Sequence, residues 1–166
     1  MGFVRRTRQH HAIEHATVTM LTRRNQVASL VGGRSDHRGF YIFGDVDTEV
    51  LQRAVDEAIT RLRAGEARLA IHPNCGTNLV TTGALAGLAT FAATMLTRRN
   101  NARIVDQIPV AIMAGIGGMM LGRPAGTRLQ RQVTTLADIG GLKLGSITRG
   151  KLWRWNYHFV TIDESI

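Results

Sequence analysis

Three histidines and a glutamate fall within one short stretch near the N-terminus, His10-His11-Ala12-Ile13-Glu14-His15. Residues three and four apart share one face of an α-helix, because each residue turns the helix by about 100°. In a helix, His11 and His15 would therefore be neighbours, with Glu14 beside them. Two imidazoles at this spacing can bind one metal ion, and an adjacent carboxylate can accept a proton from a water molecule. The spacing predicts a zinc site with His11 and His15 as ligands and Glu14 as the catalytic base.

A catalytic zinc site needs a third protein ligand and one open coordination position. His72 is the preferred candidate, because it ends a short expected strand and opens the polar stretch His72-Pro73-Asn74-Cys75-Gly76. Cys75 is the alternative, as a thiolate ligand. Glu14 can instead be a ligand, and the sequence then offers no obvious base.

The H-x-x-E-H spacing matches the inverted zinc motif of certain metallopeptidases. Those enzymes take a further carboxylate ligand from a downstream helix, and Glu57 and Glu66 are available here, although neither spacing is diagnostic. The interpretation without a metal is a polar helix face whose histidines hydrogen-bond backbone groups or water. The density of ligand-type residues favours the metal site.

Cys75 is the single cysteine of the chain, which excludes an intrachain disulfide and a four-thiolate metal cluster. It stands where a long helix is expected to begin, and a helix N-terminus favours the thiolate form. With His11 or His15 as base, Cys75 is therefore a candidate catalytic nucleophile. The alternative is that residues 73–76 form only a tight turn.

Residues 1–75 alternate between helical and strand-like patterns. The expected elements are a helix over 7–25, strands over 27–31 and 40–43 joined by a polar loop over 32–39, a helix over 48–64 and a strand over 68–71. Asp45 or Asp47 is expected to cap the second helix, and Gly65 to end it. These elements predict an α+β fold for a first domain over 1–75.

The composition changes at Gly76, since residues 76–97 carry no charge. A helix of this length spans roughly 33 Å, enough to cross a hydrocarbon layer of about 30 Å. Residues 107–122 are also uncharged but shorter, and a basic loop over 98–103 lies between. The pattern predicts a transmembrane two-helix hairpin over 76–122. The alternative is a soluble helical hairpin buried in a larger core or in an oligomer.

Both apolar segments carry glycines four residues apart, Gly83 with Gly87 and Gly118 with Gly122. This spacing lets helix backbones approach closely in lipid. We therefore expect small-residue helix faces that contact a membrane-protein partner or a second copy of the chain.

Residues 123–166 are expected to form a basic linker and then a strand over 151–162 that returns to the sheet of the first domain. The aromatic residues and cations of that strand would also suit the lipid headgroup zone. They are Lys151, Trp153, Arg154, Trp155 and Tyr157.

The formal net charge of +9 suits anionic partners, which include nucleic acid, acidic proteins and anionic lipids. The arginines are scattered and the aromatic residues are few, so nucleic acid is an unlikely partner and the lipid bilayer the expected one. The basic N-terminus is not followed by an apolar stretch, so no cleaved signal peptide is expected. We expect the protein in the cytoplasmic membrane, with its N-terminal unit facing the cytoplasm.

Two motifs, His11-Ala12-Ile13-Glu14-His15-Ala16-Thr17 and His72-Pro73-Asn74-Cys75-Gly76-Thr77-Asn78, are followed by a pair of small-residue apolar segments. With them the chain resembles an uncharacterised family of bacterial membrane-associated proteins, a domain of unknown function found in phototrophic and related bacteria. The resemblance covers most of residues 8–122. It implies a fold and a membrane setting, and no mechanism.

Together these features predict a small membrane-anchored metal-binding protein that acts as a zinc-dependent hydrolase on a peptide or a lipid-linked ester. The alternative is a non-catalytic accessory or assembly subunit of a bacterial membrane complex, in which the histidines are buried hydrogen-bonding groups.

Overall fold

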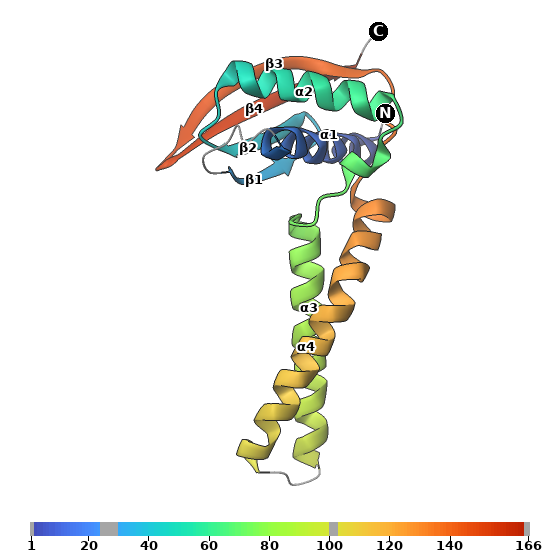
Figure 1. The fold of residues 1–166 in the computed structure, drawn as a ribbon, viewed down its shortest axis with the longest axis vertical. Helices are drawn as coiled ribbons and strands as arrows, with labels where there is room; N and C mark the ends of the chain where they lie inside the picture. Colours follow the sequence, from blue (N-terminus) through green and yellow to red (C-terminus); the bar gives the residue numbers. More distant parts are fainter. Residues whose placement is uncertain (1, 24–29, 100–102, 165–166) are drawn as a thin grey trace. The chain divides into compact units, whose positions relative to one another are not determined.

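The computed structural model describes residues 2–23, 30–99 and 103–164. The elements follow one another in the order shown in Figure 1: α1 (Phe3–Arg23), β1 (Leu30–Ser35), β2 (Gly39–Gly44), α2 (Thr48–Arg63), a 3₁₀ turn η1 (Ala67–Ala70), α3 (Gly76–Arg99), α4 (Ile104–Leu129), a π-helical turn η2 (Gln130–Thr134), β3 (Leu142–Leu152) and β4 (Trp155–Glu164). The predicted α+β class is confirmed.

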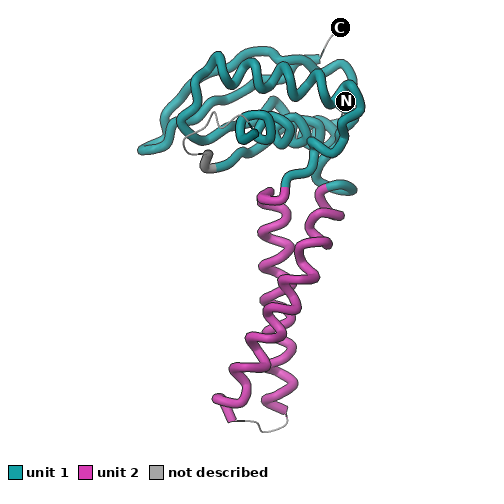
Figure 2. Tube along the Cα trace, viewed as in Figure 1, with its two compact units in different colours: residues 1–72, 131–166 teal, residues 73–130 magenta. Residues whose placement is uncertain are grey.

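The chain divides into two compact units, coloured separately in Figure 2. Unit 1 comprises residues 1–72 and 131–166, and unit 2 comprises residues 73–130. Unit 1 therefore contains α1, α2 and the whole sheet, whereas unit 2 consists of the α3–α4 pair.

The sheet of unit 1 is antiparallel, with strand order β1-β2-β4-β3. β4 pairs with β2 from Gly39↔Thr161 to Phe43↔Tyr157, so the C-terminal segment returns to the N-terminal sheet as predicted. It contributes two strands rather than the one expected over 151–162. The chain reverses between them at Trp153 and Arg154, so the alternating pattern of 151–162 spans a hairpin turn.

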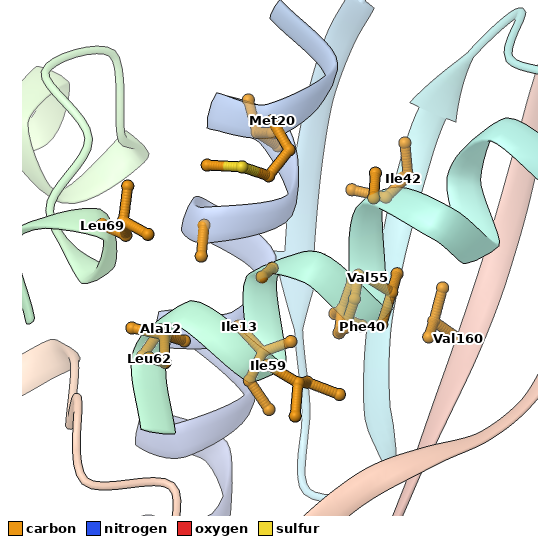
Figure 3. Close-up of a cluster of buried hydrophobic side chains, with 14 of the residues drawn as sticks. Ala12, Ile13, Met20, Phe40, Ile42, Val55, Ile59, Leu62, Leu69 and Val160 are labelled. Carbon is orange, nitrogen blue, oxygen red and sulfur yellow. The ribbon is translucent and has the colours of Figure 1, made fainter. Parts of the chain in front are cut away.

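The core of unit 1 lies between one face of the sheet and the helices α1 and α2. Alternate strand residues supply the sheet side, because successive side chains of a strand point to opposite faces. The fully or almost fully buried residues include Ile13, Phe40, Ile42, Val55 and Val160 (Figure 3). Burying such a side chain stabilises the fold by about 1.5–3 kcal/mol, so this cluster fixes how α1 lies on the sheet.

The first hairpin differs from the sequence-based expectation. β1 continues to Ser35, so the connection to β2 contains only residues 36–38 instead of 32–39. Gly32 and Gly33 are weak strand formers, which hides this strand in the sequence. The register shifts between Leu30 and Gly32, as in a β-bulge. Most of the strand expected over 27–31 lies outside the described residues.

The ends of α2 follow local rules. The Asp47 side chain accepts hydrogen bonds from the backbone N–H groups of Glu49 and Val50, so Asp47 is the cap. Gly65, with φ +90°, follows the helix end, where a left-handed residue is normally glycine. The strand expected over 68–71 is wrong. Residues 67–70 form the 3₁₀ turn, and the Ile71 N–H donates to Arg68 O instead of to a neighbouring strand.

Unit 2 is held together by close backbone contact between α3 and α4. A Cβ atom on Gly118 would lie 2.7 Å from Ala86 Cα, and one on Gly122 would lie 2.5 Å from Thr82 Cα. Gly118 and Gly122 therefore pack α4 on α3 within the hairpin, and the expected contact with a partner or a second copy stays a prediction. Gly83 and Gly87 take no part in this packing, since no described atom lies within 4 Å of a Cβ at either position.

α4 also extends beyond residue 122, where the apolar segment was expected to end. Its face of small residues continues to Gly126, where a Cβ would lie 2.9 Å from Asn78 Cα. The same packing that holds the middle of the hairpin therefore extends past Arg123 and Pro124. Proline weakens a helix interior because it lacks an N–H. Tertiary contact here maintains a helix that local sequence signals would end.

Two helices are long and apolar enough to cross a membrane by length and composition: α3 and the helical segment Ile104–Thr134. Buried residues make up 0% of the most apolar window of the first and 6% of that of the second. The soluble-core alternative needs such helices to be covered, and within the described chain they are not.

Candidate metal centre

The structure brings together the three histidines predicted as metal ligands. The rings of His11 and His15 meet edge to face with centroids 4.3 Å apart, and their ligand nitrogens lie within 4.8 Å of each other. The ring of His72 lies 5.9 Å from that of His15. His15 is buried, whereas His11 and His72 are partly exposed. The three imidazoles therefore form a cluster in unit 1 that is accessible on one side.

Two of these imidazoles are oriented by backbone carbonyl groups. His11 Nδ1 lies 2.9 Å from Thr134 O, and His15 Nδ1 lies 2.7 Å from Ala70 O. A carbonyl oxygen only accepts, so each Nδ1 carries the proton and donates it. The lone pair of each neutral ring is then on Nε2. Metal-bound histidines commonly show this arrangement, in which the second ring nitrogen donates to a carbonyl or a carboxylate.

The segments that supply these carbonyls are fixed against α1. Arg8 donates from its guanidinium to Gln132 O and Thr135 O, and the Leu136 N–H donates to Arg8 O. These bonds hold the stretch that contains Thr134 beside the helix. Ala70 ends the 3₁₀ turn, which packs on α1 through the buried Leu69. The segments that contain Ala70 and Thr134 are far from α1 in the sequence, and they orient its two histidines.

Glu14 lies on the neighbouring face of α1, toward β1. Its carboxylate accepts a short hydrogen bond from Ser35 Oγ and lies against Gly33, where any Cβ would overlap it. Only 5% of Glu14 is exposed. Around the helix it is about 60° from His11 and about 100° from His15. The carboxylate is thus held firmly beside the histidine cluster rather than between its two helical members.

His10 is separated from the cluster, although the sequence places it next to His11. It is fully buried, and its Nδ1 donates to Asp36 O at 2.7 Å. Its Nε2 has no hydrogen-bond partner among the described residues. Burial lowers the pKa of His10 below its usual value, partly offset by the Asp36 carbonyl bond.

Cys75 belongs to unit 2. Its carbonyl oxygen accepts from the Leu79 N–H, so it is the residue that precedes α3, as expected. The side chain is buried. Its roles as a thiolate ligand and as a nucleophile stay predictions.

The remaining two histidines have ordinary surroundings. His158 is buried beside Thr48, with its Nε2 3.0 Å from the hydroxyl oxygen, and burial followed by the charge of Arg149 lowers its pKa. His37 packs its ring on Phe3. The sequence did not reveal the orienting groups, Thr134 O, Ala70 O and Ser35 Oγ. A backbone carbonyl leaves no residue-type signal, and Ser35 lies in a segment expected to be a loop.

Fold and site together define a small α+β protein with a long apolar helical hairpin and a histidine cluster whose tautomers are set by the backbone. The chain belongs to the family DUF6391, a domain of unknown function, whose model matches residues 6–147. An uncharacterised family was expected from the motifs, and this is confirmed. The chain is also similar to an uncharacterised protein of Picosynechococcus sp., with 50% identity over 99 residues.

That alignment covers 54% of the chain and 48% of the relative, so the chain spans about half the length of the curated protein it matches. No solved structure matches the chain.

Proposed function

We propose that this protein is anchored in a membrane by α3 and α4 and binds one zinc ion through His11, His15 and His72 in unit 1. The observation that carries the proposal is the pair of hydrogen bonds from His11 Nδ1 to Thr134 O and from His15 Nδ1 to Ala70 O. They fix both rings in the tautomer whose Nε2 can ligate a metal. The interpretation of the histidines as hydrogen-bonding groups alone explains the Nδ1 contacts but not why the rings of His11 and His72 both lie near that of His15.

The spacing of His11 and His15 is close to the spacing that one ion needs. Two nitrogens on a tetrahedral zinc, each about 2.0–2.1 Å from it, are roughly 3.3 Å apart. The nitrogens of His11 and His15 lie within 4.8 Å, so metal binding would require the two side chains to move closer together. Imidazole is a ligand that zinc prefers, and three neutral imidazoles leave one position for water or a fourth protein ligand.

Cys75 is the proposed occupant of that fourth position if the site is structural. It follows His72 by three residues, and three residues of extended chain span at most about 10–11 Å. A thiolate as fourth ligand would close the site, as in structural zinc centres, whereas a water in that position would leave it open for catalysis. The identity of the fourth ligand therefore separates a structural role from a catalytic one.

The catalytic version of the proposal is a zinc-dependent hydrolase. Bound zinc would supply Lewis acidity. Glu14 would accept a proton from a water molecule, and Ser35 would orient the carboxylate for that step through its hydrogen bond. A peptide or a lipid-linked ester at the cytoplasmic membrane surface is the proposed substrate.

Metal analysis of the detergent-purified full chain tests the binding proposal. We expect one zinc per chain, and a loss of at least tenfold in affinity for His11→Ala and for His15→Ala. His37→Ala is the matched control, since it removes a histidine of the same unit whose ring packs on Phe3. Substoichiometric zinc that is unaffected by His11→Ala and His15→Ala would overturn the proposal.

The catalytic version needs its own measurement, with a chromogenic ester and a fluorogenic peptide as probes. Glu14→Gln should retain zinc and lose at least a hundredfold in hydrolysis rate, because the amide cannot accept the proton. A Ser35→Ala variant should retain zinc and lose less of the hydrolysis rate than Glu14→Gln. Equal hydrolysis by the original chain and Glu14→Gln would restrict the site to a structural role.

A non-catalytic accessory subunit of a membrane complex is the second candidate, and one observation favours it. Gly83 and Gly87 present a face of α3 on which a Cβ atom would meet no described atom within 4 Å. Small residues at this spacing let a partner helix approach closely in lipid. Gly87→Leu should then prevent co-purification of a fixed partner or of a second copy, whereas Gly117→Leu in α4 should not.

A further inference from the structure

The β3–β4 hairpin extends beyond the rest of the sheet. β4 pairs with β2 only as far as Tyr157, whereas its pairing with β3 continues through Asn156 to Leu152↔Trp155. The end of the hairpin is therefore a two-stranded ribbon, which Figure 1 shows projecting from the sheet of unit 1. We call residues 151–155 the hairpin tip.

The hairpin tip exposes large apolar side chains. Trp153 is 82% exposed, Leu152 is 63% exposed and Trp155 is 50% exposed. These are the two tryptophans of the chain, and neither lies in the core. Large exposed side chains gathered at one projecting point indicate a contact surface rather than a packing role.

The backbone conformation at the tip is a second, independent indication of a contact surface. Trp153 has φ +52°, the left-handed conformation that glycine adopts readily and bulky residues rarely adopt. It is the one non-glycine residue in this conformation in the part of the chain described. Glycine adopts this conformation without strain, so a tryptophan at this position carries a conformational cost.

The charge of the tip itself indicates the partner. Residues 139–162 contain four cations and no aspartate or glutamate. Arg149 pairs with Asp45 at 3.4 Å, whereas Lys151 and Arg154 lie in the tip. Tryptophan is the side chain most suited to the headgroup zone of a bilayer, where its apolar ring and N–H both find partners. Cations beside it attract anionic lipid headgroups.

The apolar surface continues from the tip onto the outer face of the sheet. Leu152 borders a hollow of about 320 Å³ together with Tyr41, Phe43 and Tyr157, and Arg34 and Asp36 supply its charged groups. The rings of Tyr41 and Tyr157 lie 5.9 Å apart, so the floor of the hollow is aromatic. This floor suits an acyl chain, whereas the two opposite charges give the hollow no preference for a phosphate.

We propose that the hairpin tip inserts into the headgroup region of an anionic lipid bilayer, as a membrane contact additional to the helical hairpin. Trp153, Leu152 and Trp155 enter the interface, and Lys151 and Arg154 bind lipid phosphates. This contact requires neither zinc nor catalysis. It rests on the proposed membrane setting only in that the same bilayer holds α3 and α4.

Intrinsic fluorescence tests this proposal selectively, because both tryptophans lie in the tip. The full chain is reconstituted into phosphatidylcholine vesicles with and without phosphatidylglycerol. With phosphatidylglycerol, we expect the emission maximum to shift to shorter wavelength and lipids brominated near the headgroup to quench at least half of the emission. Arg154→Gln should remove at least half of that quenching. Arg53→Gln, an exposed arginine of α2, should leave it unchanged.

Emission that stays at the wavelength of water-exposed tryptophan, with full quenching by aqueous iodide, would overturn the proposal. So would a blue-shifted emission that brominated lipid does not quench, because the tip would then be covered by protein. Flotation of the same vesicles reports separately on α3 and α4. Chain that floats while its tryptophans stay in water would contradict the tip contact and leave the helical anchor standing.

Discussion

Helices α1 and α3 distribute polar and apolar side chains in opposite ways. α1 buries polar and ionisable residues inside unit 1, namely Gln9, His10, Glu14, His15 and Thr17. α3 buries one residue, Asn78, and exposes its large apolar side chains, namely Leu79, Val80, Leu88, Phe91, Met95 and Leu96. The two helices are of similar length, 21 and 24 residues.

Each distribution is costly in water unless something compensates it. A buried polar group needs a hydrogen-bond partner, and α1 obtains such partners from carbonyls and hydroxyls of other segments. Exposed apolar rows need a different solvent or a partner surface. In the proposed function, unit 1 therefore binds the metal and unit 2 places the protein in a membrane.

The largest expected effect is a difference in stability loss when an apolar residue is shortened in α1 and in α3. Ile13 of α1 is fully buried, and Ile13→Ala should lower the free energy of unfolding by about 2–5 kcal/mol through a lost transfer term and a cavity. Leu88 of α3 is 64% exposed, and Leu88→Ala should change it by less than about 0.5 kcal/mol in detergent. Denaturant unfolding in micelles measures both. Equal losses would mean that α3 packs as a core helix.

Smaller changes in stability are expected for two glycines of α4, and their signs differ from each other. Gly122→Ala places a Cβ 2.5 Å from Thr82 Cα, so the helices must separate, and we expect a loss of about 1–3 kcal/mol. Gly117→Ala meets no described atom within 4 Å and should stabilise the helix by about 0.5–1 kcal/mol. Thermal unfolding of the hairpin in detergent distinguishes them. Two losses of the same size would show that α4 packs on α3 through another face.

The smallest expected effect is a difference between the two units in how their free energy of unfolding depends on pH. Burial lowers the pKa of His10 and of His158 in the folded protein, so the unfolded chain binds protons first as the pH falls through about 6.5. The free energy of unfolding of unit 1 should therefore fall below that pH, by at most about 1.4 kcal/mol per pH unit for each histidine.

Residues 73–130 contain no histidine, so unit 2 should show no such slope. Urea titrations with chelator present, at about pH 7.5 and pH 5.5, measure both units, and His10→Asn should flatten the slope of unit 1. A slope in unit 1 that His10→Asn and His158→Asn leave unchanged would contradict the assignment.

Much of the fold was predictable from the sequence where a local rule dominates. Asp47 and Gly65 mark the ends of α2, and the charge-free stretch from Gly76 marks α3. Long-range pairing was not predictable in the same way. Residues 68–71 are predicted as a strand but have no strand beside them. Residues 32–35 of β1 are predicted as a loop because Gly32 and Gly33 carry no side chain.

The histidine cluster also has one part that local sequence predicts and one part that depends on long-range contacts. Helical spacing predicts that His11 and His15 are neighbours, and their ring distance agrees. The direction of Glu14 and His10 depends on Ser35 and Asp36, which the chain brings to α1 only through the β1–β2 hairpin. A motif in sequence thus gives the spacing of ligands along a helix, whereas tertiary contacts decide which members share one site.

The absorption spectrum of the full chain loaded with Co²⁺ in place of zinc tests the central proposal most directly. Binding by His11, His15 and His72 predicts intense visible bands of a four-coordinate ion at one equivalent, which His72→Ala weakens or abolishes. A thiolate charge-transfer band in the near ultraviolet would identify Cys75 as the fourth ligand. A weak spectrum equal to that of aqueous Co²⁺, in the original chain and His72→Ala alike, would contradict the metal site.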